Sequence, residues 1–431
     1  MTKSKYYHTF FLMSCVCVFS LTLGAHLLPA LTIPYLPIAG TVWSIIVVAL
    51  NVLSALACVG ISALLLRFFL SHGIRKGGKY FWRHVRISAR LKRQLEDAGF
   101  AVKRERYVEI PWFQLGFSDD LSTGFLKIRN TIKLDRKLDD AVINAALGYF
   151  VVENRFTSCD GNYYMYELVD GRADYKLVFP SAHDFSDYAD EILPNQWFLD
   201  ARTQVPLCHT LIVGQTGSGK TYAMLSLILQ LRLMGTHPEV SFVDLKASTV
   251  GVIGRGISPH RTAKTFDQAV EQIRIFHREM GFRKQDMEKL LESNPTGDYN
   301  TFRLSPHVMI IDEYASFAQI LKGKEKKLRD EVMGLLYEIV LQGRQLGFFL
   351  VISVQKSDAT LIDTALRDNI PLKIVLGQSE DTTYITCFGS AADVPLRKYA
   401  RGEGVFTHPE LTRKPRLVQF PELNFDILEA L

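Results

Sequence analysis

The sequence Gly214-Gln215-Thr216-Gly217-Ser218-Gly219-Lys220-Thr221 fits the pattern G-x-x-x-x-G-K-[ST], in which backbone N–H groups cradle nucleotide phosphates. An apolar run at 207–213 precedes it, and an apolar stretch without proline or glycine follows at 222–234. We therefore expect a strand, a glycine turn and a helix, whose N-terminus adds partial positive charge. Lys220 is expected to reach the β- and γ-phosphates of ATP, and the Thr221 hydroxyl to bind Mg²⁺. A glycine turn without a ligand is the simpler alternative.

Two carboxylates end a second apolar run, His307-Val308-Met309-Ile310-Ile311-Asp312-Glu313. A parallel sheet would bring this end beside the phosphate loop. There Asp312 would hold Mg²⁺ through its water shell, and Glu313 would orient and polarise the attacking water. The alternative is that Asp312 only caps the helix that follows it.

Other polar residues follow apolar runs. Gln355 is either a sensor of the γ-phosphate and the attacking water or a surface glutamine. Asp244-Leu245-Lys246 either lines the site or forms an ordinary ion pair. Arg344 and Arg367 are candidates for an arginine finger that reaches the nucleotide of a neighbouring subunit, although either could be a surface residue.

A basic segment follows the two carboxylates, within a part of the chain that is otherwise acidic. It reads Lys322-Gly323-Lys324-Glu325-Lys326-Lys327-Leu328-Arg329. Inside a ring of subunits, Lys324, Lys326 and Lys327 could contact DNA phosphates without reading sequence. The alternative is a solvated helix start.

From about residue 183 apolar runs alternate with helical stretches, which indicates an α/β fold with a mainly parallel sheet and the phosphate loop after its first strand. The runs are nearly continuous, as in strands buried on both faces. The expected strands are Leu211–Val213, Val240–Val243, His307–Ile311, Phe348–Ser353 and Leu372–Leu376, and the expected helices lie at 220–234, 265–290, 325–342 and 359–368.

Between the apolar N-terminal part and this ATPase domain at 183–431, the sequence predicts a basic juxtamembrane neck at 71–117 and a small α+β domain at 118–182. The small domain shows no catalytic constellation, so we expect a structural or assembly role. Turn signals separate its expected elements. In the neck and the small domain these are helices over His84–Asp97 and Leu138–Val152 and strands over Gly124–Ile132, Tyr163–Val169 and Tyr175–Phe179.

The N-terminal part lacks Lys, Arg, Asp and Glu between Lys5 and Arg67. Apolar stretches at about 10–31 and 42–66 fill this gap, and each is as long as a membrane-crossing helix of about 20 residues. The segment 33–40 contains two prolines and is expected to form the turn between them.

The resulting membrane hairpin, 1–70, has basic residues at both outer ends: Lys3 and Lys5 before it, and a cluster from Arg67 onwards. Because positive residues remain inside, we expect two spans in the cell membrane with the N-terminus and the ATPase domain in the cytoplasm. A cleaved signal peptide is the alternative for the first stretch.

Charge is unevenly distributed along the chain, whose formal net charge is +5. Residues 67–106 carry +9 and Lys3 and Lys5 add two, which leaves 107–431 at −6. Net charge therefore gives no argument that the main body binds nucleic acid. We expect the basic cluster to contact anionic lipid headgroups, at about 1 kcal/mol per Lys or Arg, with a nucleic-acid contact as the alternative.

The six cysteines exclude two classes of protein. Three of them lie in the apolar stretches, and the others are isolated, without a C-x-x-C pair or a nearby histidine cluster. This pattern is neither a disulfide framework nor a zinc site, and it fits a reducing cytoplasm.

The motifs resemble, in order, those of the motor domain of the FtsK/SpoIIIE family of DNA translocases, over about 204–406. Asp244-Leu245-Lys246 stands where that family usually has Asp-Pro-Lys. The matching pieces are Val205-Pro206 to His209, the phosphate loop, Asp244-Leu245-Lys246, Asp312-Glu313, Gly343-Arg344-Gln345-Leu346-Gly347, Val354-Gln355 and Asn369-Ile370-Pro371.

Within that family, the layout and the motif Asp312-Glu313-Tyr314 resemble the TcpA-like coupling proteins of Gram-positive conjugative elements. The resemblance implies a RecA-like P-loop motor that hydrolyses ATP with Mg²⁺, works as a homo-hexamer, and delivers DNA to a conjugative transfer channel. It also implies a relaxase and transfer-channel proteins as partners.

Two departures and two alternatives accompany this resemblance. Gln355-Lys356-Ser357 replaces the Gln-Arg-Pro motif of division translocases, which leaves their DNA contacts in doubt here. Their long linker and C-terminal winged-helix module are not found, which argues against chromosome segregation.

The alternative functions are an ATPase that energises protein export and a nucleotide-gated docking scaffold.

Overall fold

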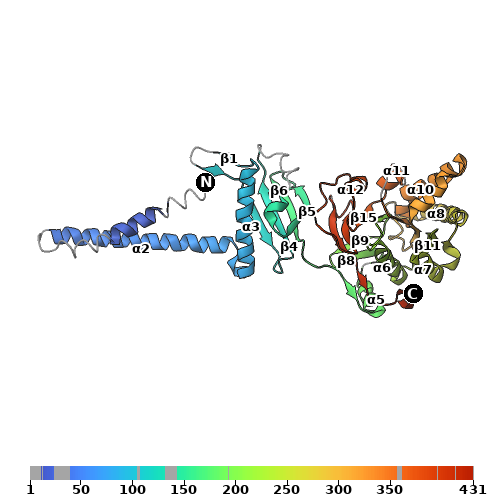
Figure 1. Ribbon diagram of the computed structural model, residues 1–431, viewed down its shortest axis with the longest axis horizontal. Helices are drawn as coiled ribbons and strands as arrows, with labels where there is room; N and C mark the ends of the chain where they lie inside the picture. The colour runs from blue at the N-terminus through green and yellow to red at the C-terminus, as the bar shows by residue number, and fades with distance from the viewer. Residues whose placement is uncertain are drawn as a thin grey trace. The chain divides into compact units, whose positions relative to one another are not determined.

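The computed structural model describes residues 11, 13–23, 39–103, 107–131, 143–192, 194–356, 362–395, 397–412 and 414–430. The chain divides into two compact units, Met1–Ala173 and Asp174–Leu431, called here the first and the second unit (Figure 1).

The first unit contains one long apolar helix, α2 (Ala39–Ser71). Its segment Ser44–Ser71 has a mean hydropathy of 2.5 with no part of it buried, and it is long enough to cross a membrane. A shorter apolar helix, Met13–Leu23, lies beside it, since the Thr22 and Ser54 hydroxyls are 2.5 Å apart. Most of the turn expected at 33–40 lies outside the described residues, so the two-span hairpin stays a prediction.

The rest of the first unit is a four-stranded antiparallel sheet, in the order β3-β4-β6-β5, with α3 against it (Figure 1). Tyr80, Ile87, Leu91 and Leu95 lie on one face of α3 and are buried against the sheet, as amphipathic spacing predicts. The elements are α3 (Gly78–Asp97), β1 (Val102–Lys103), β2 (Val108–Glu109), β3 (Phe113–Phe117), β4 (Thr123–Arg129), α4 (Asn144–Leu147), β5 (Phe150–Thr157) and β6 (Tyr163–Asp170).

This arrangement differs from the expected division into a neck at 71–117 and a small domain at 118–182. Helix α3 and strand β3 share one hydrophobic core with β4 and β6. The boundary between the two units follows Ala173, so the segment 174–182 belongs with the second unit.

The helix expected over Leu138–Val152 is largely wrong within the described residues. Only Asn144–Leu147 is helical there, and β5 begins at Phe150. Gly148 has φ 71, a left-handed conformation that ends the helix at low cost only for glycine. Val151 and Val152 then pair with β6, so cross-strand pairing prevails over the helical propensity of the alanines before them.

The second unit is built on an eight-stranded sheet in the order β12-β11-β13-β14-β10-β15-β16-β17. The first six strands are parallel, and β16 and β17 are antiparallel. All five expected strands are present. The bounds are β10 (Thr210–Gly214), β11 (Glu239–Asp244), β12 (Thr262–Ala263), β13 (His307–Asp312), β14 (Phe348–Val354), β15 (Leu372–Leu376), β16 (Glu403–Thr407) and β17 (Arg416–Gln419).

Helices cover both faces of this sheet, which explains its nearly continuous apolar strands. Phe349 and Val351 of β14 share a core with residues of α6 and α7. Phe348 points to the opposite face, where its ring lies 5.1 Å from that of Phe276 in α8. The helices are α6 (Lys220–Leu233), α7 (Thr249–Ile257), α8 (Phe266–Ser293), α9 (Tyr314–Lys322), α10 (Lys326–Leu346), α11 (Thr364–Asp368) and α12 (Asp381–Phe388).

The first segment of the second unit packs against the sheet and pairs with the end of the chain. The strand expected over Tyr175–Phe179 is reduced to β7 (Val178–Phe179), which pairs with β18 (Glu422–Leu423). Along the chain, β7 is followed by α5 (Ala182–Asp190) and then by a hairpin of β8 (Gln196–Asp200) and β9 (Thr203–Pro206), before the first strand of the sheet begins.

Candidate active site

The phosphate loop joins the buried strand β10 to α6, as the sequence predicts. Gly217 and Gly219 have φ values of 86° and 97°, which L side chains rarely adopt. A Cβ atom at Gly219 would lie 2.4 Å from the backbone nitrogen of Gly402, and the Gly402 N–H donates to the Ser218 carbonyl at 2.8 Å. The loop therefore rests against the turn that leads into β16.

The loop offers polar groups for a phosphate. The Ser218 side chain is buried, and its Oγ has no hydrogen-bond partner among the described residues. Thr221, the second residue of α6, is exposed, and the Lys220 side chain is 13% exposed. An unpartnered hydroxyl, an ammonium group and a helix N-terminus at one loop fit a polyphosphate with its divalent cation.

Asp312 is the last residue of β13 and Glu313 follows it, at the edge of the sheet where β10 also ends. Two ammonium groups converge on one of them: Lys220 Nζ and Lys246 Nζ each lie 3.5 Å from Glu313 Oε2. Glu313 is buried and has φ 51, and its N–H donates to Ser353 Oγ at 3.1 Å. Tertiary contacts thus hold Glu313 in a conformation that non-glycine residues rarely adopt.

Asp312 is held by hydroxyl groups from two neighbouring strand ends. Ser353 Oγ donates to its Oδ1 at 2.6 Å, and Ser248 Oγ donates to its Oδ2 at 2.7 Å. The residue before α9 is Glu313, and its side chain makes no capping hydrogen bond. The helix-cap alternative for Asp312 is therefore not what the geometry shows, and its carboxylate is oriented at the edge where Mg²⁺ would bind.

For Asp244-Leu245-Lys246 the sequence left open whether the motif lines the site or forms an ordinary ion pair, and both descriptions apply: Lys246 forms an ion pair with Glu313 of the site. Asp244 accepts hydrogen bonds from the N–H groups of Lys246 and Ser248, at 2.9 and 2.6 Å, so it shapes the loop after β11. A Cβ atom at Gly251 would lie 2.2 Å from Asp244 Oδ2. The loop in turn directs Lys246 to Glu313.

Gln355 is the first residue after β14, the strand between β10 and β13. Its side chain is exposed, and it lies at the edge that carries both the phosphate loop and the carboxylates. The neighbouring Lys356 is occupied by an ion pair with Glu380, 2.7 Å long. The sensor role of Gln355 stays a prediction.

The two candidate arginines are not at this edge. Arg344 lies at the end of α10, which leads into the start of β14, and it pairs with Glu410 at 2.8 Å while 80% exposed. Arg367 lies in α11 before β15 and is buried, 3.5 Å from Asp368. Within one chain both are therefore separated from the phosphate loop, and only a neighbouring subunit could bring either to a nucleotide.

The basic segment after α9 is exposed. Lys326 and Lys327 begin α10, and Lys324 lies 5.0 Å above the ring of Phe266. These three side chains are solvent-accessible, as a DNA-contacting role would require.

Sequence reasoning missed several residues that complete the site. Ser248 and Ser353 hold Asp312, and Gly402 supports the phosphate loop. Tyr222 and Arg401, whose guanidinium lies 4.4 Å above the tyrosine ring, line a cavity of about 210 Å³ beside Gly219. The doublet of glycines in Arg401-Gly402-Glu403-Gly404 was the one available signal, whereas single serines carry none.

Known proteins are similar to parts of this chain. Residues 188–301 match the model of the FtsK/SpoIIIE family. The "Ftsk domain-containing protein YdcQ" of Bacillus subtilis is 29% identical over 198 residues, which are 46% of this chain and 40% of that protein. A "DNA translocase FtsK" of Caldanaerobacter subterraneus is 26% identical over 237 residues, 52% of this chain and 31% of that protein.

A solved structure, the monomer of the "pCW3 conjugation coupling protein TcpA" with ATPγS, aligns with a TM-score of 0.48 and 17% identity. The alignment covers 78% of this chain and 94% of that one. The chain spans less than half the length of the curated relatives named above. The segment 188–301, which includes the phosphate loop, is thus similar to the FtsK/SpoIIIE family.

Proposed function

We propose that this chain is a membrane-anchored, ATP-driven DNA translocase that acts as a coupling protein and delivers DNA to a conjugative transfer channel. The observation that carries the proposal is that Lys220 and Lys246 both form ion pairs with Glu313. The neighbouring Asp312 accepts hydrogen bonds from two hydroxyl groups. These are the groups that phosphoryl transfer to water needs, arranged around one phosphate loop.

Each residue has a distinct task in this proposal. The loop N–H groups and Lys220 bind the β- and γ-phosphates, and Thr221 and Asp312 hold Mg²⁺, which neutralises charge on the phosphates. A triphosphate competes with Glu313 for the two ammonium groups. Glu313 then orients and polarises the attacking water, and Gln355, between the two halves of the site, senses the γ-phosphate.

The membrane and oligomer parts rest on other observations. The apolar helix α2 is long enough to span a bilayer, and the basic residues that follow it favour the cytoplasmic side for the second unit. Because Arg344 lies far from the phosphate loop of its own chain, a catalytic role for it requires a ring of subunits, which we propose to be a homo-hexamer. Lys324, Lys326 and Lys327 would contact the DNA, and a relaxase and channel proteins would be the partners.

The test uses two variants of the full chain in detergent. Lys220→Ala should lose ATP binding, because it removes the ammonium group that faces the phosphates. Glu313→Gln should bind ATP yet hydrolyse it at least about 100-fold more slowly, the range expected for loss of a general base. Nucleotide binding and phosphate release are measured on the same samples.

Glu288→Gln, on the exposed face of α8, is the matched control and should behave as the wild type. Wild-type hydrolysis by Glu313→Gln would reject the water-activating role, and normal binding by Lys220→Ala would reject the phosphate site.

A further inference from the structure

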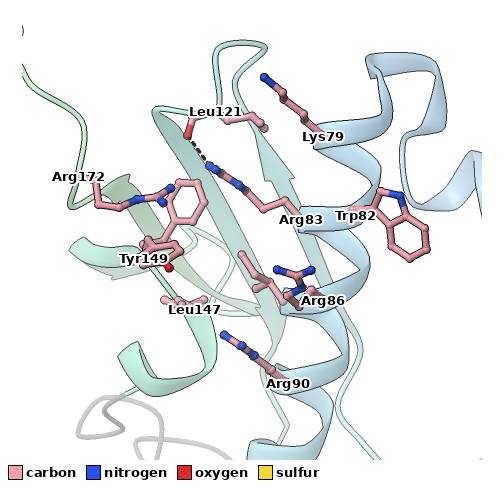
Figure 2. Close-up of a pocket in the computed structure, with 12 residues that line it drawn as sticks. Lys79, Trp82, Arg83, Arg86, Arg90, Leu121, Leu147, Tyr149 and Arg172 are labelled. Carbon is pink, nitrogen blue, oxygen red and sulfur yellow. Dashed lines mark hydrogen bonds between the residues drawn. The ribbon is translucent and has the colours of Figure 1, made fainter.

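The first unit contains a cavity of about 580 Å³ that lies outside the ATPase site, between α3 and the turn from α4 to β5 (Figure 2). Five cationic side chains line it, and no Asp or Glu is among its described lining residues. Figure 2 shows Arg83, Arg86 and Arg90 extending from α3 toward the side that carries Tyr149 and Leu147. The cations are Lys79, Arg83, Arg86, Arg90 and Arg172.

Four of these cations form a single stripe on α3. Lys79, Arg83, Arg86 and Arg90 are spaced by four, three and four residues, which places them on one face of the helix. Like charges at that spacing repel each other and destabilise a helix. An anion in the cavity would relieve this repulsion. The cation stripe lies beside the apolar stripe of α3 that packs against the sheet.

Among the described residues, Asp170 is the one carboxylate with which cationic side chains of the cavity form ion pairs. Asp170 pairs with Arg83 at 3.2 Å and with Arg172 at 2.8 Å, so these two guanidinium groups share one carboxylate. Lys79, Arg86 and Arg90 form no ion pair with any residue that the structure describes, and all three are exposed. The cavity therefore keeps positive charge that a ligand could neutralise.

The position of the cavity in the chain indicates the source of that ligand. Helix α3 begins seven residues after α2 ends at Ser71, and the Phe81 ring of α3 lies 5.3 Å from that of Phe69 in α2. Trp82 and Tyr149 are each 64% exposed, and such amphipathic rings prefer the interface between membrane and water. A bilayer that holds α2 brings the start of α3 to its headgroups.

We infer that this cavity binds the phosphate headgroup of an anionic phospholipid. A DNA-binding surface would need an extended basic groove that follows the backbone, whereas this cavity is bounded and has apolar walls at Leu121, Leu147 and Phe150. Arg86 and Arg90 take the phosphate oxygens, Lys79 adds charge at the end nearest to α2, and the apolar walls contact the first methylene groups of the acyl chains. A basic segment is attracted to any anionic surface. A site of this kind would in addition hold an individual lipid molecule on the protein.

The experiment measures retained lipid on the full chain in uncharged detergent by native mass spectrometry. Phosphatidylglycerol and phosphatidylcholine are supplied in parallel. The wild type should retain phosphatidylglycerol in preference, and the double variant Arg86→Gln/Arg90→Gln should lose at least about tenfold in that retention. Arg75→Gln/Arg93→Gln removes two charges from exposed positions outside the cavity and should retain the lipid as the wild type does.

Equal loss in both double variants would mean a diffuse charge effect and would overturn the inference, as would equal retention of the two lipids by the wild type. Thermal melting shows whether the double variant folds. If it does not fold, Lys79→Gln replaces it in the experiment, and this variant should show a smaller loss of phosphatidylglycerol retention.

Two further probes separate other sources of phosphate. Inorganic phosphate that binds with the same dependence on Arg86 and Arg90, without lipid retention, would assign the cavity to a soluble anion. Weaker binding of labelled DNA by the double variant, with lipid retention unchanged, would assign it to nucleic acid. Either result rejects the lipid site, and neither bears on ATP hydrolysis by the second unit.

Discussion

His209 is a buried imidazole directly before β10, and its Nδ1 accepts the Leu350 N–H at 3.0 Å. Burial lowers its pKa to about 3, from an ordinary value of 6.5. The folded protein therefore keeps this ring neutral at pH values where the unfolded chain protonates it. The stability of the second unit should be complete above about pH 6.5 and should fall as pH decreases from 6.5 toward 3.

We predict that His209→Asn reduces this acid sensitivity. The asparagine Oδ1 can accept the Leu350 N–H, but the side chain takes up no proton. Between the two pKa values the wild type should lose up to about 1.4 kcal/mol per pH unit at this site, and the variant should lack that contribution. Denaturant unfolding of the full chain at pH 7 and pH 5 measures the difference. Equal pH dependence of wild type and variant would contradict it.

At the candidate site the sequence was informative where a single motif brings the polar residues together. The phosphate loop, Asp312 and Glu313 could be read directly, since each follows an apolar strand. Ser248, Ser353 and Gly402 could not, because they contact Asp312 and the loop from segments distant in sequence. Single hydroxyls and glycines become recognisable only when the strand ends are brought together.

At the scale of elements, the motif Gly343-Arg344-Gln345-Leu346-Gly347 has a structural explanation. A Cβ atom at Gly343 would lie 2.2 Å from the Phe348 carbonyl oxygen, so α10 approaches β14 too closely for a larger residue. Gly347 has φ 78 and ends the helix in the conformation that glycine favours. The two glycines of the motif therefore fix the turn from α10 into β14, and this explanation does not depend on a role for Arg344 as an arginine finger.

Gly343→Ala should consequently destabilise the second unit, by about 1–3 kcal/mol as overpacked sites do. Gly334→Ala is its control in the same helix, because an added Cβ there meets no described atom within 4 Å. That substitution should stabilise the protein by about 0.5–1 kcal/mol through helix propensity. The two thermal midpoints should thus move in opposite directions, and a shift of the same sign would refute the close-approach explanation.

The basic segment at the start of α10 allows a test of DNA contact. Replacing Lys324, Lys326 and Lys327 with glutamine should weaken DNA binding and make its salt dependence shallower, by about 0.7–0.9 in the log–log slope per lost phosphate contact. Lys264, Lys284 and Lys289, all exposed elsewhere on the second unit, give a control of equal charge. Unchanged salt dependence in the first triple variant would remove this segment from the DNA path.

The elements that sequence predicted well share a physical cause, and so do those that it missed. Strands β10, β11, β13, β14 and β15 are buried on both faces, so their apolar runs are unmistakable. Strand β5 has one face toward solvent and follows an alanine-rich helical turn, and β16 and β17 pair through contacts made late in the chain. Half-buried and antiparallel strands give a weaker pattern, and tertiary pairing decides them.

At the scale of the whole molecule, charge and hydropathy separate the two units. The first unit holds the apolar helices and the whole basic cluster at 67–106, whereas 107–431 has a net charge of −6. If the second unit contacts DNA, as we propose, it would do so through a local basic segment such as the one at 322–329. The lipid cavity of the first unit and the ATPase site of the second are thus separate proposals with separate tests.

The central claim is that this chain hydrolyses ATP in response to DNA. The direct measurement is phosphate release by the full chain in detergent, with Mg²⁺ and ATP, in the presence of duplex DNA, single-stranded DNA, an unfolded polypeptide or no addition, with Glu313→Gln as the background. We expect release above that background, increased by one or both forms of DNA and not by the polypeptide. An increase with the polypeptide alone would favour protein export, and no release under any condition would contradict the account.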